Sequence, residues 1–194
     1  MRFKLHCCLT LITVTLMWAW PATVEAQTVV GEASAVTATV IGAVTTLADT
    51  GPLSVINDVL DASAGAGNVP SLLTAEVLNA DTISWPDEVD SAASLANLNL
   101  NIAGSGIQAD SVLAKASQVS GSAGTGSAII NNLSINGIPI LVTGAPNQIV
   151  GIPGGQVILN EQTVSQSGAV VVNAVHVIVG LADVKIASAT AGIS

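Results

Sequence analysis

The chain has 194 residues, of which half are hydrophobic, 9% are charged and 2% are aromatic, and its formal net charge is −9. Four lysine and arginine residues in total cannot neutralise a row of phosphates, which excludes nucleic acid as a partner. Both cysteines, Cys7 and Cys8, lie at the start of the chain, so the remainder has no disulfide or thiol chemistry.

The first 26 residues have the pattern of a secretory signal peptide. Arg2 and Lys4 precede the apolar run 7–20, and Val24-Glu25-Ala26 follows as a cleavage site. The apolar run is shorter than the roughly 20 residues that a membrane-spanning helix needs. We therefore expect a cleaved leader over 1–26, a single domain over 27–194 that is secreted or held at the cell surface, and no membrane insertion.

The predicted mature domain has few reactive side chains. Residues 27–194 contain one tryptophan (Trp85), one histidine (His176), two lysines and twelve carboxylates, with no Cys, Met, Phe, Tyr or Arg. About 170 residues suffice to bury one core of valine, isoleucine, leucine and alanine. We expect no cofactor.

Strands are predicted by alternation of apolar and polar side chains. Val36 and Ala38 alternate with threonines, Ala96 to Ile102 alternates with three asparagines, and Val184 and Ile186 alternate with Asp183, Lys185 and Ala187. The run 169–179 is nearly continuous in valine, which predicts a central strand covered on both faces. Segments of this kind recur every 10–15 residues, as in an antiparallel β-sandwich.

One segment has helical rather than strand spacing. Leu53, Ile56, Val59 and Leu60 fall on one face of a helix, with Pro52 near its start. The sequence therefore predicts a short helix near residues 52–63.

Glycine-containing turns separate the predicted strands. Asn136-Gly137, between two isoleucines, predicts a two-residue hairpin, and Pro139 restricts the next segment to an edge strand or a loop. The glycine-rich run 121–126 lacks the lysine of a phosphate-binding loop and is predicted to be a flexible hairpin connection.

The only acidic cluster is formed by Asp87, Glu88 and Asp90. Carboxylate oxygens on a loop can bind calcium, although the spacing matches no EF-hand. Paired carboxylates can also act as acid and base on a glycan. Trp85, just before the cluster, is either a stacking surface for a sugar or a cap on the end of the core.

His176 is the only imidazole of the predicted mature chain. Alternation places it with Val172, Ala174 and Ile178 on one strand face, where we expect a neutral ring with a hydrogen-bonded nitrogen. A Ser-His-Asp triad has no support, because no Gly-x-Ser-x-Gly elbow is present.

The C-terminal motifs resemble a known family. Gly154 to Gln162, which contains Leu-Asn-Glu-Gln, and Val172 to Val177, which reads Val-Asn-Ala-Val-His-Val, are similar to the bacterial exported surface domains called choice-of-anchor P. The motif positions are Asn160, Glu161, Gln162, Asn173 and His176. The resemblance implies an exported β domain with no known catalytic activity. This chain ends at Ser194 without a sorting motif, so we expect no covalent anchor.

The sequence therefore favours a structural or adhesive module outside the cell. We expect no bond chemistry, and strands of low charge could associate with another copy or with a matrix or surface partner through their edges. Two alternatives stay open, a glycan-active enzyme and a calcium-dependent binding module, both using Asp87, Glu88 and Asp90.

Overall fold

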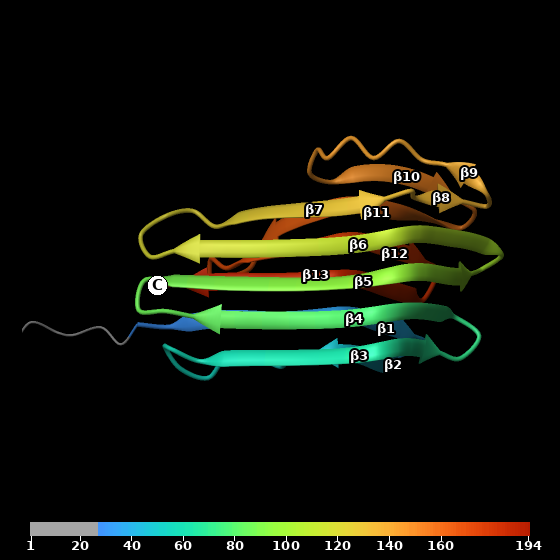
Figure 1. Cartoon of the computed structure of the whole chain (residues 1–194). Coiled ribbons are helices and arrows are strands. Elements are labelled where there is room, and N and C mark those ends of the chain that lie inside the picture. Colours follow the sequence, from blue (N-terminus) through green and yellow to red (C-terminus); the bar gives the residue numbers. More distant parts are fainter. Residues whose placement is uncertain (1–26) are drawn as a thin grey trace, which may run out of the picture.

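The computed structural model describes residues 27–194, and the predicted leader lies outside these described residues. Two antiparallel sheets are stacked face to face, which confirms the predicted β-sandwich (Figure 1). Sheet A has the strand order β10-β11-β12-β13-β1-β2. Its strands are β1 (Val29–Val40), β2 (Ala43–Asp49), β10 (Gln148–Ile152), β11 (Gly155–Val164), β12 (Val170–Val179) and β13 (Ala182–Ile193).

Sheet B is built from the middle of the chain. Its order is β3-β4-β5-β6-β8-β9, with β7 also paired to β6. Its strands are β3 (Val59–Val69), β4 (Leu73–Ser84), β5 (Glu88–Ile102), β6 (Ser105–Val119), β7 (Thr125–Asn131), β8 (Ser134–Ile135) and β9 (Ile138–Pro139). Strands β5 and β6 have 15 residues each, longer than most strands of globular proteins.

Most neighbouring strands are also neighbours in sequence, and β1 with β13 is the main exception. These two strands pair antiparallel from Val29↔Ile193 to Val40↔Ala182. Beyond the ladder, the Thr28 amide donates to the Ser194 carbonyl at 2.9 Å, and the Ser194 amide donates to the Thr28 carbonyl at 3.1 Å. The first and last described strands therefore lie side by side in the interior of sheet A.

The core between the sheets consists of alanine, valine, leucine and isoleucine side chains. Strand β12 is buried along almost its whole length, which confirms the predicted central strand. Near one edge the sheets approach closely: a Cβ added to Gly124 would lie 2.7 Å from Val170 Cγ1, and one added to Gly126 would collide with Val172. Gly126 therefore belongs to tightly packed β7, while only the start of the predicted connection, with Gly121 at a φ of 75°, forms the turn.

The inward-facing positions change phase partway along the strands of both sheets. In β5 the buried positions are Val89, Ser91, Ala93 and Leu95, and then Leu98, Leu100 and Ile102. In β6 they are Ser105, Ile107 and Ala109, and then Val112, Ala114 and Ala116. We call the line across each sheet where this happens the crease. Ala96 is therefore not on the face of Leu98 as predicted, and Ala187 faces the interior rather than solvent.

Residues whose backbone has a positive φ, in the left-handed region, lie along the crease. Asn97, Asn132 and Val77 in sheet B have φ between 49° and 54°, and Ala48, Ala187 and Asn160 in sheet A have φ between 46° and 50°. On either side of Asn97 the pairs Ala96↔Ser111 and Leu98↔Ala109 keep one register, so no residue is inserted between β5 and β6. The β4–β5 ladder shifts register twice between Thr74 and Asn79, around Val77, and then returns to its original register. Asparagine adopts this conformation easily, but a β-branched residue such as Val77 does so at a cost.

The predicted helix near residues 52–63 is wrong. Residues 52–58 form a loop, and β3 begins at Val59. The Leu53 side chain is buried and its amide donates to the Gly31 carbonyl at 2.8 Å. The Asp58 carboxylate accepts hydrogen bonds from both the amide and the hydroxyl of Ser54, at 3.1 and 3.0 Å. The apolar residues of this segment have helical spacing by chance, because the buried loop residue Leu53 is followed by the start of β3.

The predicted Asn-Gly hairpin is confirmed. Asn136 and Gly137 have φ of 52° and 75° and connect β8 to β9, which ends at Pro139. The Asn136 side chain also accepts a hydrogen bond from the Gly106 amide at 2.8 Å, which joins this turn to the start of β6.

Replacing Val77 by glycine tests the strain at the crease. Val77 is 58% exposed, so we expect Val77→Gly to raise the free energy of unfolding by up to about 1 kcal/mol, because glycine relieves the left-handed strain. The control is Val44→Gly, which we expect to lower it by about 0.5–1 kcal/mol, because Val44 is similarly exposed (64%) on ordinary strand backbone. Urea unfolding measures both, and equal losses would contradict the assignment of strain.

Candidate functional site

The residues of the two C-terminal motifs come together on sheet A. Asn173 Nδ2 donates a hydrogen bond to Glu161 Oε2 at 2.6 Å, and His176 Nδ1 lies 2.8 Å from the same oxygen. Asn173 and His176 are both buried, with exposed fractions of 4% and 6%. One carboxylate oxygen therefore fixes an amide and an imidazole from the neighbouring strand. We call Glu161, Asn173, His176 and Asp183 the histidine cluster.

The sheet A ladder and the crease explain this position. Glu161 of β11 is the cross-strand partner of Asn173 in β12, and His176 is the partner of Lys185 in β13. Because the crease falls between Asn173 and His176, both lie on the outer face, whereas Val172 and Ala174 belong to the core. The predicted sharing of one face by His176, Val172 and Ala174 is therefore wrong.

The second imidazole nitrogen has a weaker partner. His176 Nε2 lies 3.1 Å from Asp183 Oδ1, but the two atoms do not have the geometry of a hydrogen bond. The Asp183 side chain is 46% exposed, while that of Glu161 is 16% exposed. Within residues 27–194, no serine hydroxyl forms a hydrogen bond with His176. Among the described residues, the imidazole is therefore oriented by two carboxylates, Glu161 and Asp183.

Asn160 and Gln162 have a different role from the histidine cluster. Gln162 Nε2 donates to Asn160 Oδ1 at 2.9 Å and to the Gly126 carbonyl of β7 at 3.0 Å. Asn160 Nδ2 donates to the Gly144 carbonyl at 2.9 Å. These two amides tie β11 to sheet B and to the segment before β10, so they hold the edge of the sandwich together.

The acidic cluster is divided between a turn and a strand. Asp87 is exposed in the turn between β4 and β5, while Glu88 and Asp90 belong to β5. Glu88 Oε1 accepts a hydrogen bond from Ser117 Oγ at 3.4 Å. Within the described residues, no three carboxylate, imidazole or thiol side chains gather in a group that could hold a metal ion. Calcium binding by Asp87, Glu88 and Asp90 therefore stays a prediction without a ligand cluster to support it.

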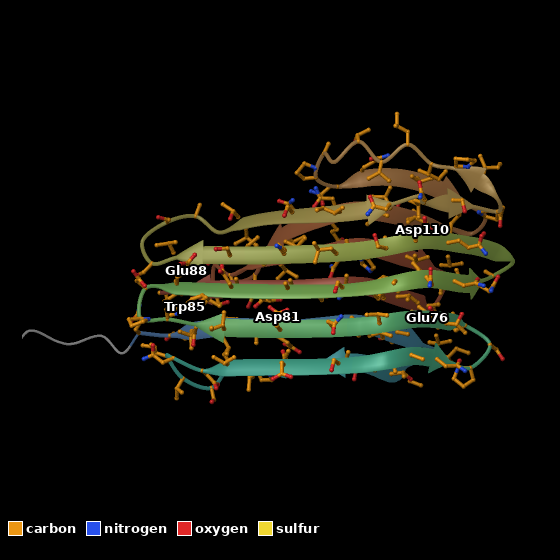
Figure 2. All side chains as sticks on the ribbon, in the orientation of Figure 1. Glu76, Asp81, Trp85, Glu88 and Asp110 are labelled. Carbon is orange, nitrogen blue, oxygen red and sulfur yellow. The ribbon has the colours of Figure 1, made fainter. Side chains whose placement is uncertain are left out.

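A hollow on the outer face of sheet B contains Asp90 together with residues that the sequence did not single out. It has a volume of about 390 Å³, and Asp81, Ile83, Ala92, Lys115 and Ser117 line it with Asp90. We call it the sheet B groove. Figure 2 shows Asp81 on β4, near the middle of this sheet. Loss of water around the carboxyl raises the pKa of Asp81 above its ordinary value, and the positive charge of Lys115 offsets part of this.

Among residues 27–194 there is no helix that is both long and apolar enough to span a membrane. Comparisons with models of protein families, with curated proteins and with solved structures find no match for this chain. The resemblance to choice-of-anchor P domains therefore stays a prediction.

The histidine cluster can be tested by truncating each of its carboxylates. We expect Glu161→Ala to lower the free energy of unfolding by about 2–3 kcal/mol, because it leaves buried donors on Asn173 and His176 without an acceptor. Asp183→Ala is the matched control, with an expected loss below about 1 kcal/mol, because Asp183 is half exposed. Urea unfolding distinguishes the two, and an equal or larger loss for Asp183→Ala would contradict the assigned roles.

The raised pKa of Asp81 predicts a pH-dependent effect of its replacement. Above the folded-state pKa the ionised carboxylate destabilises the fold, and the penalty disappears as the pH falls below the unfolded value near 4. Asp81→Asn should therefore raise the free energy of unfolding at pH 7 by less than about 1 kcal/mol, because the side chain is exposed. At pH 3 the variant and the parent should be equal, and a destabilised variant at pH 7 would contradict this account.

Proposed function

We propose that this domain serves outside the cell as a structural or adhesive module without bond chemistry, and that two copies associate through the free edge of β3. The observation that carries the proposal is this edge, which lies at the border of sheet B (Figure 1). The leader-like pattern of residues 1–26 supports the location. The histidine cluster supports a non-catalytic role, because no serine hydroxyl among the described residues forms a hydrogen bond with His176.

Strand β3 has few of the features that protect edge strands. It runs for 11 residues, and its one charged side chain is Asp61. It contains neither lysine nor proline, the residues that most often prevent edge-to-edge pairing. An edge strand of this length presents a row of backbone amides and carbonyls without ladder partners, which can accept a further strand.

The other edges are shorter. In sheet A, β2 has seven residues and β10 has five. On the far side of sheet B, β7 has seven residues, and β9 has two and ends at Pro139. A new ladder needs several consecutive backbone pairs to offset the entropy lost on association. Strand β3 therefore offers the most favourable edge for association.

A second copy of the chain fits this edge in charge and in backbone shape. Antiparallel pairing centred on Gly65 and Ala66 keeps the two Asp61 carboxylates at opposite ends of the new ladder. The same register brings the crease of one copy, which crosses β3 beside Val77, opposite the crease of the other. Symmetric pairing of identical surfaces is the commonest way in which soluble proteins dimerise.

Sedimentation velocity over a range of concentrations tests the proposal. We expect the purified protein to form a concentration-dependent dimer, and Ser63→Lys to weaken it at least tenfold by placing a charge on β3. The matched control is Ser94→Lys, in the interior strand β5 of the same sheet, which should leave the dimer unchanged. A protein that stays monomeric at high concentration, or equal dissociation by both variants, would overturn the proposal.

A further inference from the structure

We propose that the sheet B groove binds a neutral saccharide. Three consecutive rows of outward-facing side chains form the surface, and the strand register sets them side by side. The rows are Asp81–Ala92–Lys115, Ile83–Asp90–Ser117 and Trp85–Glu88–Val119. Ala92 has only a methyl group between the longer Asp81 and Lys115 side chains, which produces the hollow of about 390 Å³.

The charged groups of the groove are available for a ligand. In the part of the chain that the structure describes, the Asp81 and Asp90 carboxylates and the Lys115 ammonium form no ion pair within 4 Å and accept or donate no hydrogen bond to the protein. Charged side chains that make no contact with the protein can form charge-assisted hydrogen bonds to a ligand, and these are the stronger kind.

The mixture of charges selects the class of ligand. The carboxylates of Asp81 and Asp90, with Asp61 and Glu88 in the same rows, repel an anionic ligand. Lys115 on β6, one strand beyond Asp90, supplies the one positive charge of the groove. A sugar hydroxyl can donate to Asp81 or Asp90 and can accept from Lys115, and the Ser117 hydroxyl, which donates to Glu88, can accept a hydrogen bond from the sugar. A neutral polyhydroxylated molecule can therefore form hydrogen bonds with both carboxylates and with the ammonium of the groove.

Trp85 extends the surface along the strand direction. Its amide donates to the Glu88 carbonyl at 2.7 Å, which places it in the third row, and its side chain is 38% exposed (Figure 2). Trp85 directly follows the last residue of β4 and is four positions after Asp81, a distance of about 13 Å at strand spacing. A flat amphipathic ring at this distance provides an apolar contact surface at the end of a polar groove. The ligand that spans both is longer than one sugar ring.

Calorimetric titration with oligosaccharides tests the inference. The probes are hexasaccharides of glucose, mannose and N-acetylglucosamine, with hexagalacturonic acid and hexaglucosamine as the anionic and cationic counterparts. We expect at least one neutral probe to bind with a Kd on the order of 0.1 mM, as for an open surface site with few polar contacts. No neutral binding at millimolar concentration, or tighter binding of a charged probe, would overturn the proposal.

The two lysines of the described chain give a matched pair of variants. Lys115→Met should weaken binding at least tenfold, whereas Lys185→Met, on the outer face of sheet A, should leave it unchanged. Ala92→Leu fills the floor of the groove without altering a charge and should also weaken binding at least tenfold. Equal effects of both lysine variants, or binding unaffected by Ala92→Leu, would overturn the location. Circular dichroism confirms that each variant is folded.

The same titrations separate this inference from the proposed non-catalytic role. Release of reducing ends from a bound probe, lost in Asp90→Asn, would overturn the non-catalytic role and would support a ligand in the groove. A parallel measurement of dimerisation tests only the association through β3, because no β3 side chain lines the groove.

Discussion

The arrangement of the crease constrains the rest of this structure. Adjacent strands must change phase at the same line, because a strand that shifted alone would turn its apolar side chains toward solvent on one side of the shift. The left-handed backbone at Asn97, Asn160 and Ala187 accomplishes this with no net insertion of a residue in either partner. Which side chains line each outer face, and therefore where any site can form, depends on the position of this line.

The parts of the fold that depend on local signals could be predicted from the sequence. The Asn136-Gly137 turn needs positive φ at both residues, and the valine run of β12 can be buried on both faces only in the middle of a layer. The crease gives no comparable signal. It passes through alanines such as Ala35, Ala174 and Ala187, which fit either face, so alternation continues unbroken in the sequence while it reverses in the structure. The wrong prediction of a helix at residues 52–63 also came from a sequence pattern, apolar residues that have helical spacing by chance.

The candidate sites were harder to predict because they depend on register. The sequence identifies Glu161, Asn173 and His176 as motif residues, yet the contact of Asn173 and His176 with one Glu161 oxygen depends on the β11–β12 ladder and on the crease. Asp81 and Lys115 belong to strands separated by β5, and nothing in their local sequence relates them. The one available signal was the scarcity of lysine, which makes each of the two an unusual feature of the surface.

The interior position of β13, the last strand, affects how the domain folds. In sheet A, β13 lies between β12 and β1. Strand β1 therefore cannot form its ladder with β13 until the last strand of the domain has been synthesised. A ribosome that delivers the chain from its N-terminus cannot assemble this layer progressively. Contacts between such distant positions also make folding slow. Delayed assembly of this kind keeps the polypeptide unfolded for longer, which is the state that the proposed export through a narrow channel would require.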